Sequence, residues 1–169
     1  MTANNLDSVY NDFDELITKL KKDNELSAST SIETTVSKLI IVSAASFFES
    51  DIKDAIFSIY TDTKSRNLVE KLLDRNFWNM FDSKFESMNR FLNNFGDEFR
   101  IEFQKSIQGN QTLEDSAIAF LRLLQLRGEI VHMNFLSHSI DVTYQESYEI
   151  YKQSLDYVEY LKKKIIERK

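Results

Sequence analysis

Residues 113–132 of the chain read LEDSAIAFLRLLQLRGEIVH, and from Ala117 to Leu126 nearly every residue is apolar. The polar loop QGNQT precedes this stretch, and Thr112 followed by Asp115 has the spacing of a helix start. A helix that is apolar around most of its circumference must be covered by other elements on all sides. We therefore predict that this segment is the central helix of a bundle.

The composition of the whole chain favours the same architecture. Its 169 residues include no proline and three glycines, so few sharp turns are encoded, and long helices are favoured over a many-stranded sheet. The length suits one domain with a substantial core. We predict a single all-α domain over residues 1–169, an antiparallel bundle of long helices around the central apolar one.

Apolar periodicity and helix-start signals predict the other elements. Apolar residues at three- and four-residue steps predict a helix over residues 6–20. Thr30 with Glu33 has the spacing of a capping box, so a second helix is expected to start at about residue 31 and to run as far as Tyr60.

Polar or glycine-containing stretches separate the remaining predicted helices. Three further segments are predicted to be connections: TDTKSR at 61–66, NNFGDEF around Gly96, and NFLSHSIDV at 134–142. The region 67–102 is rich in aromatic residues and contains the single tryptophan, Trp78. Thr143 with Glu146 indicates the start of the last helix.

Several classes of site are excluded or disfavoured. The chain has no cysteine, which excludes disulfides, thiol catalysis and cysteine-ligated zinc. It has no glycine-rich phosphate loop, no His-Glu-x-x-His pair and no Gly-x-Ser-x-Gly elbow. Its two histidines, His132 and His138, have no acid cluster near them at helical spacing. We expect no metal and no cofactor, and we expect His138 to be exposed to solvent.

The charge and hydropathy patterns limit the kinds of partner that the chain is expected to bind. A net charge of −6 lacks the excess of lysine and arginine that is typical of a general nucleic-acid coat. Any contact with a polyanion must therefore be made by a few cations at a local site. No apolar run is judged long enough to span a bilayer, and the N-terminus lacks a signal pattern, so we expect a soluble, cytoplasmic protein with no membrane partner.

The candidate for chemistry is the pair Arg127 and His132 at the end of the apolar stretch. Imidazole accepts and returns protons near neutral pH, and the planar guanidinium fork matches phosphate oxygens. Together they suit attack on a phosphodiester. His132 would take the proton of an RNA 2′-hydroxyl, and Arg127 would neutralise charge that builds up on the phosphate oxygens.

The spacing of the pair favours a composite site. Five residues along a helix leave the two side chains roughly 140° apart around the axis, so two copies of the chain, each giving one pair to a shared cleft, make a more complete site. Gly128 interrupts the helix between them. Either it lets another backbone approach closely, or it loosens the last turns before the loop.

The segments LEDSAIAFLRLLQLRGEIVH, NNFGDEF and LIIVSAASFFESDIKDAI occur in an order that resembles the HEPN superfamily, and in particular its RiboL-PSP type, over most of residues 31–165. The resemblance implies an all-α bundle that forms a homodimer, with Arg-x4-6-His motifs of two protomers facing each other. It also implies metal-independent endoribonuclease activity in prokaryotic defence or toxin–antitoxin systems. Arg127 and His132 match the two fixed positions of that motif.

The chain departs from the motif at one position. The family commonly has Asn, Asp or His directly after the arginine, and this chain has Gly128. A carboxylate from the second helix sometimes joins the family's site, and Glu49 or Asp51 could have that role here. Either one could equally be a surface acid or a partner for Arg127.

Three functions follow as hypotheses. The first is a dimeric ribonuclease that acts on RNA, with an antitoxin or operon partner. The second is a catalytically silent HEPN-like module that binds a partner protein, a nucleotide or RNA, which Gly128 and the acidic charge favour. The third is a purely structural helical adaptor, which would leave Arg127 within an apolar helix without a purpose.

Overall fold

The helix α6 (Gln111–His132) lies at the centre of the computed structural model of the chain, which describes residues 3–81, 88–133, 135 and 139–168. It packs against α7 (Tyr144–Ile166) and α2 (Leu26–Ser58). Most of its apolar residues are buried, among them Ala117, Phe120 and Leu123, while Ile118 and Val131 are exposed. The prediction of a central apolar helix is confirmed.

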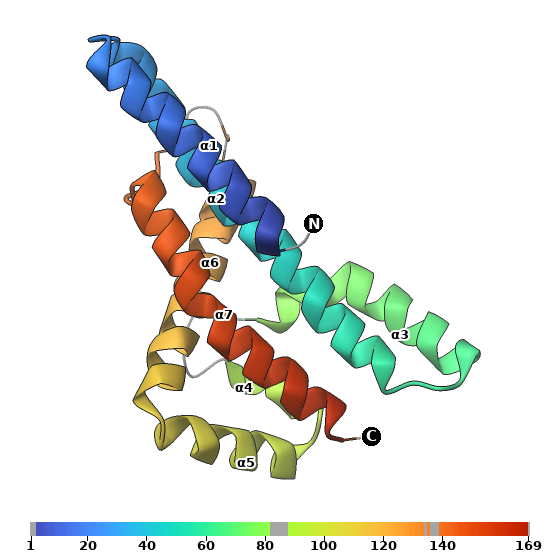
Figure 1. Cartoon of the computed structure of the whole chain (residues 1–169). Coiled ribbons are helices and arrows are strands. Elements are labelled where there is room, and N and C mark those ends of the chain that lie inside the picture. Colours follow the sequence, from blue (N-terminus) through green and yellow to red (C-terminus); the bar gives the residue numbers. More distant parts are fainter. Residues whose placement is uncertain (1–2, 82–87, 134, 136–138, 169) are drawn as a thin grey trace.

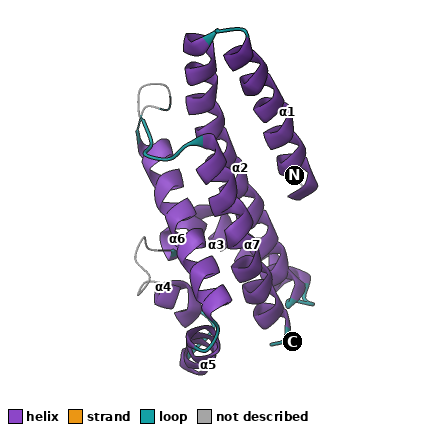
Figure 2. Cartoon of the chain, turned by 60° about the vertical axis from the view of Figure 1, so that its left-hand side comes forward, coloured by secondary structure: helices purple, strands orange, loops and turns teal. Residues whose placement is uncertain are grey.

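The long helices form the bundle that the composition predicts. Figure 1 shows α1 (Ala3–Lys22) running antiparallel to α2, and α6 running antiparallel to α7. The helices α2 and α7 lie side by side and run in the same direction (Figures 1 and 2). Helices account for 86% of the described residues, which contain no strand, so the all-α prediction is confirmed.

Shorter elements cover the lower end of α6 and lead to it. The chain leaves α2 into α3 (Thr63–Asn76), which continues into the short 3-10 helix η1 (Phe77–Met80). The helices α4 (Met88–Asn93) and α5 (Asp97–Gln108) follow, and α5 crosses the end of the bundle (Figure 1). Gly96 between them has φ 96°, a left-handed conformation that favours glycine, so the predicted break is confirmed.

Two of the predicted helix starts are wrong. The helix α2 begins at Leu26, and the hydroxyl of Thr30 donates to the carbonyl of Leu26 at 3.0 Å instead of capping a new helix. The hydroxyl of Ser29 donates to Glu33 at 2.9 Å. The spacing of a capping box also fits residues inside a continuous helix, because serine and threonine hydroxyls can bond back to the preceding turn.

The start of α6 is two residues earlier than predicted. Asn110 is its N-cap, and its side chain accepts from the backbone N–H of Leu113 at 3.3 Å. The predicted connection 61–66 is also too long, because Asp62 caps α3 by accepting from the backbone N–H of Ser65 at 2.7 Å. In both cases an Asn or Asp side chain provides the cap at an earlier position than predicted.

The predicted start of the last helix is confirmed. The backbone N–H of Thr143 donates to the carboxylate of Glu146 at 2.7 Å, and the backbone N–H of Glu146 donates to the hydroxyl of Thr143 at 3.2 Å. These reciprocal bonds are a capping box. Of the predicted connection before it, residues 134 and 136–138 lie outside the described residues, and residues 139–142 are not helical.

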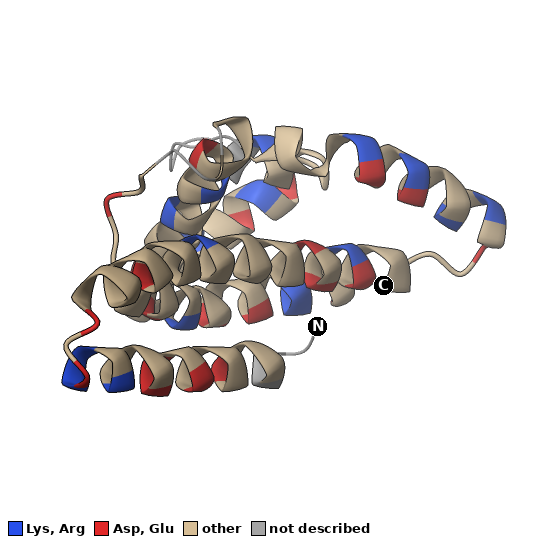
Figure 3. Cartoon of the chain, turned by 90° about the horizontal axis from the view of Figure 1, so that it is seen from above, with Lys and Arg blue, Asp and Glu red and all other residues tan. Residues whose placement is uncertain are grey.

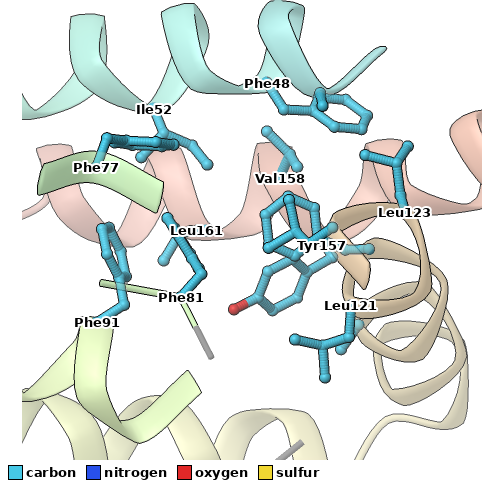
Figure 4. Close-up of a cluster of buried hydrophobic side chains, with 14 of the residues drawn as sticks. Phe48, Ile52, Phe77, Phe81, Phe91, Leu121, Leu123, Tyr157, Val158 and Leu161 are labelled. Atoms are coloured by element: carbon cyan, nitrogen blue, oxygen red, sulfur yellow. The ribbon is translucent and has the colours of Figure 1, made fainter. Parts of the chain in front are cut away.

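The core is aromatic and joins α2, α6, α7 and the short elements. Figure 4 shows Phe48 from α2, Phe77 and Phe81 from the η1 region, and Tyr157 from α7 around the same cluster. Within this core, two hydrogen bonds of Ser116 join α6 to α7. Its hydroxyl donates to the carbonyl of Gln153 at 2.5 Å and accepts from the backbone N–H of Tyr157 at 2.7 Å. This satisfied buried hydroxyl fixes the register of the two helices.

The helix α2 is long and apolar enough to cross a membrane by length and composition alone, whereas we expected no such run. This part of the expectation was wrong. Of its most apolar window, 44% is buried inside the fold, and the helix packs against α1, α6 and α7. Its apolar character is accounted for by burial between three helices, so we interpret α2 as a core helix.

Candidate functional site

A hollow of about 400 Å³ lies beside the last turns of α6. It is lined by α6 on one side and by the η1 region on the other. Its lining residues are Trp78, Asn79, Phe81, Leu124, Gln125, Arg127, Gly128 and His132. The apolar side chains come from the edge of the core, and the polar ones are the residues that α6 and η1 turn toward solvent. Both residues of the Arg-x4-His pair therefore line one hollow.

Arg127 is half-buried on the flank of α6. Its guanidinium carbon lies 4.2 Å from the centroid of the Trp78 ring, which is a close cation–π contact. Burial lowers the pKa of Arg127, and the charge of Glu49 acts in the opposite direction. Among the described residues, no hydrogen bond or ion pair occupies the guanidinium N–H groups. These donors are available to a ligand in the hollow.

Trp78 is fixed by the aromatic core beneath it. Its ring meets that of Phe77 edge-on, with the centroids 5.2 Å apart, and Phe77 is itself packed against Phe81 at 5.1 Å. Phe77 and Phe81 are buried. The 3-10 helix therefore anchors one aromatic residue in the core and presents the next one to the hollow.

Trp78 and Asn79 were not among the residues predicted for the site. The only signal in the sequence was a single tryptophan followed by an asparagine in an aromatic-rich region. Nothing local indicated that this tryptophan would meet Arg127, which lies 49 positions further along the chain. A long-range contact of this kind leaves no periodic pattern in the sequence.

His132 is the last residue of α6 and is exposed at the edge of the hollow. The helix ends there because Met133 is extended, with its backbone N–H still donating to the carbonyl of Glu129 at 3.1 Å. The position of His132 at the end of the helix lets this side chain turn toward the hollow although Arg127 projects from another side of the helix.

Glu49 stands near Arg127 but is bonded elsewhere. Its carboxylate forms an ion pair with Lys53 at 2.7 Å, and Lys53 also pairs with Asp74 at 2.9 Å. Lys53 lies 5.5 Å from the ring centroid of Phe77. Glu49 therefore acts on Arg127 through its field, while its hydrogen-bonding oxygen is occupied by Lys53.

Asp51 lies on another side of α2. Its carboxylate accepts from the ammonium group of Lys162 on α7 at 2.6 Å. Burial acts to lower the pKa of Lys162, but the hydrogen bonds to Asp51 and Glu159 raise it overall. Asp51 is not among the residues that line the hollow, and its contact ties α2 to α7.

Gly128 lies in the wall of the hollow, and apart from its chain neighbours and the backbone of its own helix, no atom of the described residues lies within 4 Å of where its Cβ would be. Within the described part of the subunit, no backbone outside its own helix makes the close approach that would require a glycine. The open space belongs to the hollow itself, where a side chain at this position would stand beside Arg127.

Two further predictions from the sequence concern metal binding and His138. Within the described residues, no group of three or more histidines, aspartates and glutamates could hold a metal ion. His138 lies outside the described residues, so its predicted exposure stays a prediction.

Comparison with known families gives one match. The model of the family described as RiboL-PSP-HEPN matches residues 7–167, which is nearly the whole chain. Searches of curated proteins and of solved structures find no match.

Proposed function

The chain belongs to the RiboL-PSP-HEPN family, and from this premise we propose that it is a metal-independent endoribonuclease of a prokaryotic defence or toxin–antitoxin system. The family supports a nuclease or RNA-binding module in general terms. One observation carries the finer proposal: Arg127 and His132 line the same hollow, and the guanidinium N–H groups are not bonded by any described residue.

The proposed reaction needs only these two kinds of side chain and the RNA itself. His132 accepts the proton of a 2′-hydroxyl, and the resulting oxygen nucleophile attacks the adjacent phosphorus. The bond between phosphorus and the 5′-oxygen breaks, which leaves a 2′,3′-cyclic phosphate and a 5′-hydroxyl. Arg127 donates to the non-bridging oxygens and offsets the charge that develops on them. One proton moves from the 2′-oxygen to the 5′-oxygen, and no water is consumed.

A second protomer completes this proposal. The departing 5′-oxygen needs a proton donor, which His132 of the second protomer supplies when two hollows face each other across a twofold axis. Apolar side chains around His132 support such a contact: Val131, Met133 and Phe135 are 48%, 58% and 39% exposed. An apolar rim of this kind is typical of an interaction surface. We further propose a cytoplasmic location and an antitoxin or operon partner protein.

The test is cleavage of single-stranded RNA by the purified chain in the presence of a chelator. We expect products with cyclic-phosphate ends, and we expect His132→Ala to lose cleavage by several orders of magnitude while it stays helical by circular dichroism. The matched control is His138→Ala, the only other histidine of the chain, which should cleave like the wild type. Cleavage that requires magnesium, or that persists in His132→Ala, would rule the proposal out.

A second candidate function is a catalytically silent module that binds a partner protein, a nucleotide or RNA. The absence of a side chain at Gly128 favours it, because the hollow lacks the polar group that the family's motif commonly places there. In that case no RNA is cleaved, while Arg127→Ala still weakens binding of a labelled oligonucleotide. Binding that is equal in Arg127→Ala and wild type would exclude a ligand site at this hollow.

A further inference from the structure

The aromatic face of Trp78 holds the guanidinium of Arg127, and this arrangement differs from an ordinary ion pair. The guanidinium carbon is 4.2 Å from the ring centroid, and tryptophan is the strongest of the aromatic partners for a cation. A ring contact provides no oxygen acceptor, so it does not occupy the N–H groups of the guanidinium with hydrogen bonds to oxygen. A carboxylate instead takes the N–H groups at its edge, which are the groups that a phosphate needs.

A carboxylate acts on Arg127 through its charge. The negative charge of Glu49 acts to raise the pKa of Arg127, against the effect of burial. It is occupied by Lys53 at 2.7 Å, and Lys53 is held in turn by Asp74 at 2.9 Å. Glu49 would offer Arg127 a second, more strongly bonded position if the guanidinium were free to turn.

The tryptophan can hold Arg127 in place because it is itself held. Phe77, its neighbour in η1, is buried and meets the Trp78 ring edge-on at 5.2 Å. Lys53 lies over the Phe77 ring, with its ammonium nitrogen 5.5 Å from the centroid. Phe77 therefore contacts both Lys53, which is paired with Glu49, and the indole of Trp78, which contacts Arg127.

We propose that Trp78 is a positioning residue, which keeps the guanidinium of Arg127 facing the hollow with its N–H groups free for a phosphate and turned away from Glu49. The role deepens the proposed function, since the phosphate would belong to RNA, but the binding step itself requires no cleavage. Trp78 acts through Arg127, so its replacement changes how well an anion binds before it changes any chemistry.

The single tryptophan of the chain allows a test that does not depend on activity. Iodide is an anionic quencher of indole fluorescence and acrylamide is a neutral one. A guanidinium against the ring concentrates iodide there, so Arg127→Ala should lower quenching by iodide about twofold or more without lowering quenching by acrylamide. Inorganic phosphate should protect the wild type against iodide. The matched control is Arg122→Ala, on the same helix but bound to Asp141 at 2.5 Å, which should quench like the wild type.

The second test measures binding of a short single-stranded DNA oligonucleotide, which has no 2′-hydroxyl and cannot be cleaved by the proposed route. Trp78→Leu should weaken binding by between about twofold and about thirtyfold, the range of a cation–π contact, and Trp78→Phe should weaken it less. Glu49→Gln should then improve binding more in the Trp78→Leu background than in the wild type, because it removes the alternative partner of Arg127. All variants are compared after their helical content has been checked by circular dichroism.

The outcomes separate this proposal from the proposed function. Iodide quenching that depends on Arg127, together with rescue of Trp78→Leu by Glu49→Gln, supports the positioning role even if no RNA is cleaved. Iodide quenching that is unchanged in Arg127→Ala overturns it, even if His132-dependent cleavage is found. Binding by Trp78→Leu that equals the wild type, or that Glu49→Gln improves equally in both backgrounds, also overturns it.

Discussion

Arg127 is the residue on which the site depends, and its surroundings favour an incoming anion. Burial lowers its pKa, which means that its charge is partly deprived of water, yet an arginine remains charged at neutral pH. The indole of Trp78 stabilises the cation only through its ring face. A bound phosphate would supply the in-plane hydrogen bonds that the described residues leave open.

Gly128 gives a prediction at the residue scale, because a side chain there meets open space. Gly128→Ala should raise the free energy of unfolding by about 0.5–1 kcal/mol, the cost of glycine within a helix, and should leave cleavage unchanged. Gly128→Asn restores a polar group of the kind that the family commonly has, and it should increase cleavage. Urea unfolding and initial cleavage rates check the two variants, and a loss of activity in Gly128→Asn would contradict the prediction.

Glu49 and Asp51 give a second prediction, as a matched pair of carboxylates on α2. Glu49→Gln removes a negative charge near Arg127, so oligonucleotide affinity should rise, by less than about fivefold for a partly exposed charge. Asp51→Asn breaks only the contact with Lys162, and it should lower the free energy of unfolding by less than about 1 kcal/mol without changing affinity. Loss of cleavage in Glu49→Gln with unchanged affinity would instead assign Glu49 a catalytic role.

At the scale of the elements, the start of α7 positions a helix that contributes buried residues along its whole length. This helix carries Tyr151, Tyr157 and Leu161, which are fully buried, and it packs against both α2 and α6. The capping box of Thr143 and Glu146 satisfies two backbone N–H groups at its first turn. The cap therefore determines where a helix begins that packs against α2 and α6 and whose Tyr144 donates to Asp14 of α1 at 2.8 Å.

Thr143→Ala tests this cap. The variant should lower the free energy of unfolding by about 1 kcal/mol, because it leaves a backbone N–H of the first turn without its acceptor. Thr34→Ala is the matched control, since the Thr34 hydroxyl donates to the carbonyl of Thr30 in the middle of α2 and caps nothing. Chemical denaturation should show a near-neutral effect there. Equal effects at both positions would show that the cap contributes nothing specific.

Glu146, the second residue of the capping box, makes the stability of the chain depend on pH. The hydrogen bonds from Thr143 to Glu146 hold the pKa of that carboxyl below its ordinary value. A folded-state pKa that is lowered contributes stability at pH values above the ordinary glutamate pKa, and this contribution is lost as the pH falls through the lowered value. Glu146→Gln should therefore destabilise the chain at neutral pH, and its difference from the wild type should shrink in acid. Thermal unfolding at a series of pH values measures it, and a difference that grew in acid would contradict the assignment.

At the scale of the whole molecule, charge is dispersed and not gathered. Figure 3 shows acidic and basic positions interleaved along the helices, and the net charge is −6. With charges interleaved in this way, the described residues offer no extended basic surface with which to follow an RNA backbone. The proposed binding of RNA would then depend on a few cations at the hollow, as expected of the proposed site to which two protomers each supply one Arg127.

The salt dependence of binding tests that view. Each phosphate neutralised on a single strand contributes about −0.7 to the slope of log affinity against log salt concentration. Contacts from a few arginines predict a slope between about −1 and −3 for a short oligonucleotide. Arg127→Ala should make the slope shallower. A slope steeper than about −5 would indicate an extended cationic surface that this distribution of charge does not provide.

Much of the fold follows from local chemistry in the sequence. The apolar circumference of Ala117–Leu126 required burial, and the reciprocal bonds of Thr143 and Glu146 needed only residues three apart, so both predictions are confirmed by the structure. The same kind of signal was wrong at Thr30, where the hydroxyl bonds back to Leu26 inside a longer helix. A local motif cannot distinguish a helix start from a helix interior, because both offer a carbonyl or N–H within reach.

The candidate pair was also visible in the sequence, but its environment was not. Only the packing of η1 against the core brings Trp78 to Arg127, only α3 supplies the second acid that holds Lys53 beside Glu49, and only α7 gives Asp51 its partner. The sequence by itself determined which segments are helices and which one is buried, since periodicity and capping act over a few residues. The tertiary structure alone decided which charges are paired and which remain open, because those contacts join residues that are distant along the chain and depend on how the helices pack.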